Sequence, residues 1–164
     1  MQQPGEYHKA SSVSEIDMAD YFKAASEFKA RLTAKATKAA ELDAFFESVR
    51  SGIHEEIANA NAYLARENAP KIEFKEGWPK GATIELVCAT AIAKVTLDPD
   101  APDGPTIATI IAGEEAEKTV TFILLHGPSP LKAQRVSLTP ATEEKAGPHE
   151  VASTIVEELI TGAP

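Results

Sequence analysis

Cys88, His126 and Trp78 are the candidate site residues of this 164-residue chain, with a ligand that the sequence leaves unknown. A reactive cysteine needs a histidine beside it in space, and nothing in the sequence brings His126 to Cys88. Cys88 also lies in an apolar run, where a free cysteine is typical of a hydrophobic core. Trp78 stands between a glycine and a proline, either as a contact anchor or as a cap on the core, and we favour the cap.

Two polar stretches begin like metal motifs, and neither fits. His54-Glu55-Glu56 opens like the helix of a zinc protease, but Ala58 stands where the second histidine ligand is required. The acidic turn Asp98–Gly104 suggests a calcium loop, yet Thr109 occupies the twelfth position, which needs glutamate. We therefore expect a polar helix face and a structural turn, in preference to a weak cation site. No metal site and no cofactor is predicted.

The rest of the sequence contains no loop for phosphate binding, no dinucleotide fingerprint and no nucleophile elbow. An enzyme is accordingly not the favoured interpretation. The chain carries 25 acidic and 16 basic residues, a net charge of −9. Nucleic-acid binding needs clustered lysine and arginine, so we expect no nucleic-acid partner.

A long helical segment is predicted over residues 14–69, after an N-terminal arm over residues 1–13. The segment from Glu15 to Asn68 has no proline, and 14 of the 28 alanines lie between Ser14 and Ala69. Stepping by three and four from Met18 to Tyr63 gives fourteen positions, of which twelve are apolar. Such a stripe indicates either a coiled coil or a straight helix packed on a globular body, and we favour the packed helix.

Length is the unusual property of this segment. A helix of 55 residues would span about 82 Å at 1.5 Å per residue, whereas a 164-residue globule is about 40 Å wide. The segment must therefore bend or fold into a hairpin, or extend and need a partner. Thr33–Thr37 and Ser51–Gly52 are the candidate breaks, and the glycine favours the second.

Residues 70–139 change to the two-residue period of β-strands. Five strands are predicted, joined by short turns into an antiparallel meander. Their ranges are 72–74, 82–97, 106–111, 119–125 and 134–139. The apolar positions of the second strand change parity near Ala89-Thr90, which predicts a β-bulge or bend. A short amphipathic helix over residues 147–162 should then lie on the sheet.

The predicted fold is thus α+β, with a single domain over residues 14–164. We expect a non-enzymatic module that oligomerises or binds a protein partner through its long N-terminal helix. The alternative is a small-molecule binding domain with a pocket between sheet and helices, near the expected bulge. A basic n-region with an apolar stretch and a membrane-spanning segment are both lacking, so we expect a cytoplasmic protein without a membrane partner.

Overall fold

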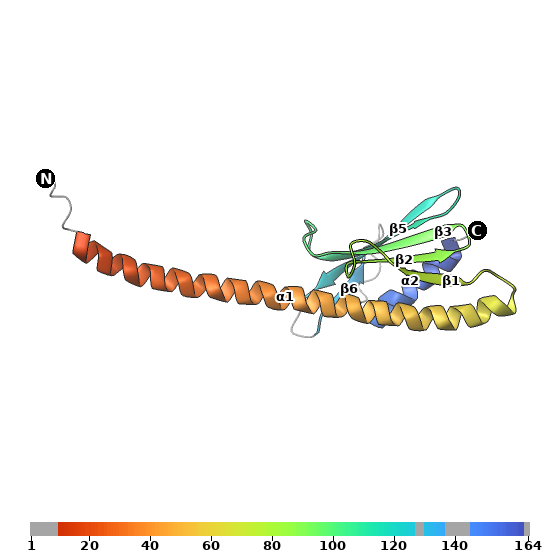
Figure 1. The fold of residues 1–164 in the computed structure, drawn as a ribbon, viewed down its shortest axis with the longest axis horizontal. Coiled ribbons are helices and arrows are strands. Elements are labelled where there is room, and N and C mark those ends of the chain that lie inside the picture. Colours follow the sequence, from red (N-terminus) through yellow and green to blue (C-terminus); the bar gives the residue numbers. More distant parts are fainter. Residues whose placement is uncertain (1–9, 127–129, 137–144, 163–164) are drawn as a thin grey trace. The chain divides into compact units, whose positions relative to one another are not determined.

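The computed structural model describes residues 10–126, 130–136 and 145–162, with side chains from residue 18 onward. Two units divide the chain, Met1–Ala40 and Glu41–Pro164. One long helix comes first, then an antiparallel sheet and a C-terminal helix (Figure 1), so the predicted α+β class is confirmed. The elements are α1 Ala10–Arg66, β1 Ile72–Glu76, β2 Thr83–Cys88, β3 Ala91–Asp98, β4 Thr106–Ala112, β5 Glu117–Leu125, β6 Lys132–Arg135, β7 Lys145–Ala146 and α2 Pro148–Gly162.

Helix α1 continues through both stretches that we considered as breaks. Thr33–Thr37 is helical, and the Thr37 hydroxyl donates a hydrogen bond of 2.9 Å to the carbonyl of Thr33 one turn earlier. Ser51–Gly52 is helical as well, so the favoured break there is wrong. The helix also begins at Ala10 rather than Ser14, and residues 1–9 of the predicted arm lie outside the described residues.

Gly52 has a packing role where the sequence suggested a break. A Cβ added to Gly52 would lie 2.9 Å from the Cβ of Ala152 on α2, closer than real Cβ contacts. The absent side chain therefore lets the two helices approach each other. A glycine inside a helix is destabilising by roughly 1 kcal/mol relative to alanine, and the close packing of α1 on α2 offsets that loss.

One face of α1 forms part of the core in the second unit. Its buried members recur at steps of three and four residues, as the sequence predicted for a packed helix: Leu42, Phe45, Phe46, Val49, Ile53 and Ile57. Arg50, beside this face, ties α1 to β1 because its Nη1 donates to both carboxylate oxygens of Glu76, at 2.8 and 2.9 Å. The helix thus adds both apolar and ionic contacts to the sheet.

The C-terminal end of α1 is closed by local hydrogen bonds. Asn68 adopts the left-handed conformation, with a φ of 53°, and the amide of Ala69 donates to the carbonyl of Leu64. Asn61 then holds the start of β1: its side chain accepts from the amide of Ile72 at 2.7 Å and donates to the carbonyl of Ile72 at 3.1 Å. The predicted end near Ala69 is therefore close to the observed one.

The sheet is an antiparallel meander of seven strands in sequence order, two more than predicted. The long strand over residues 82–97 is two strands, because Ala89 and Thr90 form a tight turn in which Ala89 has a φ of 54°. Cys88 then pairs with Ala91, and every pair of partners along β2 and β3 sums to 179. Because this sum is odd, an even-numbered residue of β2 always pairs with an odd-numbered residue of β3. The residues that share one face of the sheet are therefore even-numbered in one strand and odd-numbered in the other. The phase change marks a hairpin between two strands, so the predicted bulge or bend within one long strand is wrong.

The last part of the sheet also differs from the prediction. Strand β6 spans Lys132–Arg135, whereas we expected residues 134–139, and Val136 within that expected range is exposed. Residues 137–139 lie outside the described residues. The seventh strand, β7, has two residues and pairs with β6. A strand this short has no alternation, so the sequence carried no signal for it.

Helix α2 lies on the sheet, as predicted, and contacts strands β3 to β7. Its apolar face is buried: Val151, Ala152, Ile155, Val156 and Leu159. The Glu150 carboxylate caps the first turn by accepting from the amide of Gly147 at 3.2 Å, which lowers the Glu150 pKa. α2 and the second part of α1 therefore share one core with the inner face of the sheet (Figure 1).

Candidate functional site

Cys88 is a core residue in the structure. Its side chain is buried at the end of β2, and its Sγ lies 3.9 Å from the carbonyl oxygen of Pro70, which accepts the S–H. Burial raises the pKa of the Cys88 thiol, because the thiolate would lose its hydration. A thiol held in the neutral form is a poor nucleophile. The surroundings of Cys88 thus agree with the expectation that its side chain packs as a small apolar residue of the core.

His126 lies too far along the sheet to serve Cys88. Cys88 pairs with Ala91 at the end of the sheet where β5 begins at Glu117. His126 follows the last residue of β5, nine residues beyond Glu117, or about 30 Å at 3.3 Å per residue. Its Nδ1 instead lies 3.8 Å from a carboxylate oxygen of Glu41 on α1. The structure therefore does not bring the two candidates together.

Trp78 is 81 % exposed, so the favoured interpretation as a cap on the core is wrong. It lies in the connection between β1 and β2, before a cis bond to Pro79. The adjacent Gly77 packs on Thr83, where an added Cβ would lie 2.5 Å from the threonine methyl. The backbone contact of Gly77 closes this end of the core, and the indole remains in solvent.

The two metal-like stretches have structural roles. His54 stacks on Phe74 of β1, with ring centroids 4.0 Å apart. The carboxylate of Asp98 accepts from the amide of Asp100 at 3.0 Å, a hydrogen bond typical of an Asx turn. Within residues 10–126, 130–136 and 145–162, no group of three histidine, cysteine or acidic side chains is placed to hold a metal ion.

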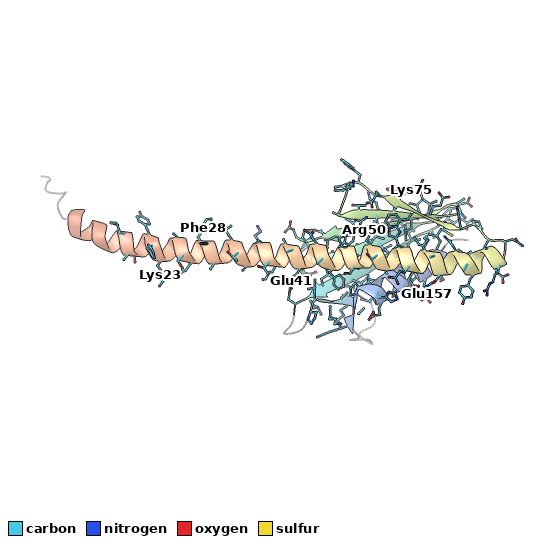
Figure 2. All side chains as sticks on the ribbon, turned by 60° about the horizontal axis from the view of Figure 1, so that its bottom comes forward. Lys23, Phe28, Glu41, Arg50, Lys75 and Glu157 are labelled. Carbon is cyan, nitrogen blue, oxygen red and sulfur yellow. The ribbon has the colours of Figure 1, made fainter. Side chains whose placement is uncertain are left out.

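Five large exposed apolar side chains gather on the first unit. We use the name α1 stripe for the exposed apolar residues of α1 at steps of three and four, together with Ala25 between them: Met18, Tyr21, Ala25, Phe28 and Leu32. Phe22 lies beside the stripe and is 80 % exposed. Figure 2 shows Phe28 and Lys23 on this part of the helix. Monomeric soluble proteins seldom expose a contiguous apolar surface of this kind.

The stripe has the spacing of the buried face of α1. Phe28 and Phe46 fall on the same run of three- and four-residue steps, yet Phe28 is 55 % exposed and Phe46 is 1 % exposed. The run is apolar in both units, and in the second unit the sheet and α2 cover it. Periodicity alone located the face. It could not show which part has a partner within the chain.

Charge varies along the first unit. Residues 10–20 carry three acidic and no basic side chains, whereas residues 21–40 carry five basic and one acidic. The basic residues are Lys23, Lys29, Arg31, Lys35 and Lys38. Arg31 also covers part of the stripe, since its guanidinium carbon lies 5.9 Å from the centre of the Phe28 ring. This part of α1 is therefore apolar along one face and has oppositely charged ends.

Three surface hollows lie among the described residues of the second unit. One of about 340 Å³ lies between α1 and the start of α2, lined by Glu47, Ser51, Glu55 and His149 among others. Another of about 280 Å³ lies further along the same two helices, and a third of about 350 Å³ adjoins the β4–β5 connection. Cys88 and Ala91 line none of the three. None of these three hollows is thus the pocket that we predicted between sheet and helices near Cys88 and Ala91.

No described helix combines the length and apolar character required to cross a bilayer. Comparison with known proteins adds no relative, since no protein family model, no curated protein and no solved structure matches this chain.

Proposed function

We propose that this chain is a protein-interaction module that binds a helical partner through the α1 stripe. The observation that carries the proposal is the contrast between Phe28 and Phe46, which share one helical spacing and differ from 55 % to 1 % in exposure. In the second unit this spacing is covered by the protein itself. The first unit repeats the pattern with aromatic and aliphatic side chains in solvent, and a partner helix is what such a face accepts.

Burial of the stripe would supply the driving force. Each large apolar side chain that passes from water into a packed interface contributes roughly 1.5–3 kcal/mol before the losses of association. Tyr21, Phe22 and Phe28 are aromatic, the class enriched at the centre of protein interfaces. The partner must therefore offer an apolar face of similar length, bordered by acidic residues where this chain is basic.

Site-specific photocrosslinking in cells tests the proposal with the full chain. A photoreactive amino acid at Leu32 should form a covalent adduct with the partner. The matched control is Lys23, nine residues earlier, which lies on the opposite side of the helix because nine residues turn it by about 900°. If position 32 gives no adduct above the level at position 23, the proposal is wrong.

Small-molecule binding is the second candidate function, and the hollow between α1 and α2 is the observation that favours it. Its volume of about 340 Å³ falls at the lower end of the usual range for ligand sites. A thermal-shift screen of metabolites would test it with His149→Ala as the matched variant. A ligand in this hollow should raise the melting temperature of the native chain and lose that effect in the variant.

A further inference from the structure

We infer that the partner of the α1 stripe is a second copy of this chain, with the two stripes paired in antiparallel orientation. This inference rests on the proposed function and names its partner. The observations behind it are the charge distribution of the first unit and the place of the one small residue of the stripe, Ala25, between its large residues.

Charge selects the orientation. Residues 10–20 carry a net charge of −3, from three acidic side chains, and residues 31–40 carry +3, from Arg31, Lys35 and Lys38. Two copies side by side in parallel would place acid against acid at one end and base against base at the other. In the antiparallel arrangement each acidic end meets a basic end, which is attractive. The segment is thus complementary to itself in one direction.

The stripe also defines a register. In antiparallel pairs the first core position of each heptad faces the fourth position of the partner helix. Partners that sum to 53 place Ala25 against Phe28, Leu32 against Tyr21, and Met18 against Lys35. The small Ala25 then faces an aromatic ring, and all four large members of the stripe are covered. The Lys35 stem can lie on Met18 while its ammonium group reaches the acidic end of the other copy.

This register involves residues 15–38 of both copies. Phe22 falls beside Lys29 on the same flank of the pair, which suits a cation–π contact. From Met18 to Lys35 the core extends over about 26 Å at 1.5 Å per residue. An interface of this length is smaller than those of obligate dimers. We therefore expect reversible dimerisation that depends on protein concentration.

Disulfide trapping tests both the partner and its orientation. Two full-length variants are made, Tyr21→Cys and Leu32→Cys, each with the buried Cys88 retained. Under mild oxidation a mixture of the two should give the mixed disulfide, because positions 21 and 32 face each other. Each variant alone should give little dimer, since equal positions lie about 16 Å apart in this register and a disulfide needs Cα atoms within about 7 Å.

The opposite pattern would overturn the antiparallel orientation. If each variant alone forms a disulfide-linked dimer, and the mixture shows no preference for the mixed disulfide, the two helices pair in parallel. The wild-type chain, whose only thiol is Cys88, is the control for thiols outside the stripe. Both positions are exposed, so neither substitution puts folding of the core at risk.

Analytical ultracentrifugation tests the dimer without any cysteine. Leu32→Asp should raise the dimer dissociation constant by about tenfold or more, whereas Lys23→Ser, on the opposite side of the helix, should change it by less than about twofold. Added salt should weaken the wild-type dimer because it screens the attraction between opposite ends. A wild-type chain that stays monomeric at every concentration tested would overturn the second copy as partner.

The two proposals fail in different ways. A monomeric chain that still gives an adduct of another mass from position 32 in cells disproves the second copy and leaves the interaction module intact. Absence of any adduct from position 32 disproves both. Co-sedimentation with vesicles of anionic phospholipid, lost in Leu32→Asp, would assign the stripe to a membrane surface and overturn the inference.

Discussion

Gly52 of α1 and Ala152 of α2 lie so close that a Cβ on the glycine would stand 2.9 Å from the alanine Cβ. The pair fixes the distance between the two helices of the second unit. We expect Gly52→Ala to destabilise the fold by about 1–2 kcal/mol through overpacking, although alanine is the better helix former. Chemical denaturation measures the change.

The double variant Gly52→Ala with Ala152→Gly provides the control, because it moves the single methyl group from one helix to the other. It should recover part of the lost stability. If Gly52→Ala alone is more stable than the wild type, α1 and α2 are not held at this distance.

Glu158 of α2 binds two strands through basic side chains. It accepts from the Nζ of Lys118 on β5 and, at 3.0 Å, from the Nη2 of Arg135 on β6. The hydrogen bond from Lys118 is the main cause that lowers the Glu158 pKa. Glu158→Gln should therefore reduce the free energy of unfolding by about 1–3 kcal/mol at neutral pH, whereas Glu157→Gln on the exposed face should leave it nearly unchanged.

The pH dependence follows from the direction of this shift. The Glu158 pKa is lower in the folded state than in the unfolded chain, where a glutamate titrates near 4.3. The ionised Glu158 carboxylate therefore makes its full contribution to the free energy of unfolding above the unfolded-state pKa. That contribution is lost as the pH falls toward the folded-state pKa. The difference between wild type and Glu158→Gln should be constant from pH 7 to about 5 and shrink below. A difference that grows on acidification would contradict the assignment.

Thr109 of β4 is fully buried, and its hydroxyl has no hydrogen-bond partner among the described residues. It pairs with Val95 on one side and Val120 on the other. Thr109→Val keeps the shape and removes the unsatisfied hydroxyl, so we expect a gain of about 1 kcal/mol in stability. Thr119→Val, on an exposed position of β5, is the matched comparison and should change stability by less than about 0.5 kcal/mol. Thermal and urea unfolding of both variants would check this.

Phe28 and Phe46 provide a matched pair on one helix. Phe46→Ala should reduce the free energy of unfolding by about 3–5 kcal/mol, as large-to-small changes in a core do. Phe28→Ala removes the same atoms from an exposed position, and unfolding of the second unit in dilute solution should barely change. An equal loss from both would mean that the stripe is already covered in the monomer.

Cys88 should be slow to react in the native chain. Burial keeps its thiol neutral and shielded, so a thiol reagent should modify it at least about tenfold faster after unfolding. Ellman's reagent, with and without denaturant, measures the two rates. Rapid modification of the native chain would reopen Cys88 as a site residue.

The sequence predicted those parts of the fold that repeat a simple pattern. Helix α2, the inward Val120, Phe122 and Leu124 of β5, and the apolar spacing of α1 all follow from period and composition. The hairpin at Ala89-Thr90 was missed because neither residue is a usual hairpin residue, although the change of parity was its signal. β7 has too few residues for any pattern.

Other features depend on tertiary contacts that no local pattern records. The role of Gly52 depends on Ala152, one hundred residues later, so local propensity suggested a break instead. The Lys118–Glu158–Arg135 contact joins three elements and has no spacing to recognise. The apolar face of α1 was visible in the sequence. Which part of that face is covered and which part is exposed could be seen only once the positions of the sheet and α2 were known.

Asn61 affects how the sheet can meet other chains. Among the described residues β1 pairs with β2 alone, and an unpaired strand edge offers free amides and carbonyls on which a further strand can add. The side chain of Asn61 takes both backbone groups of Ile72, so the first position of β1 is already occupied. Growth of the sheet by strand addition is therefore blocked at that position.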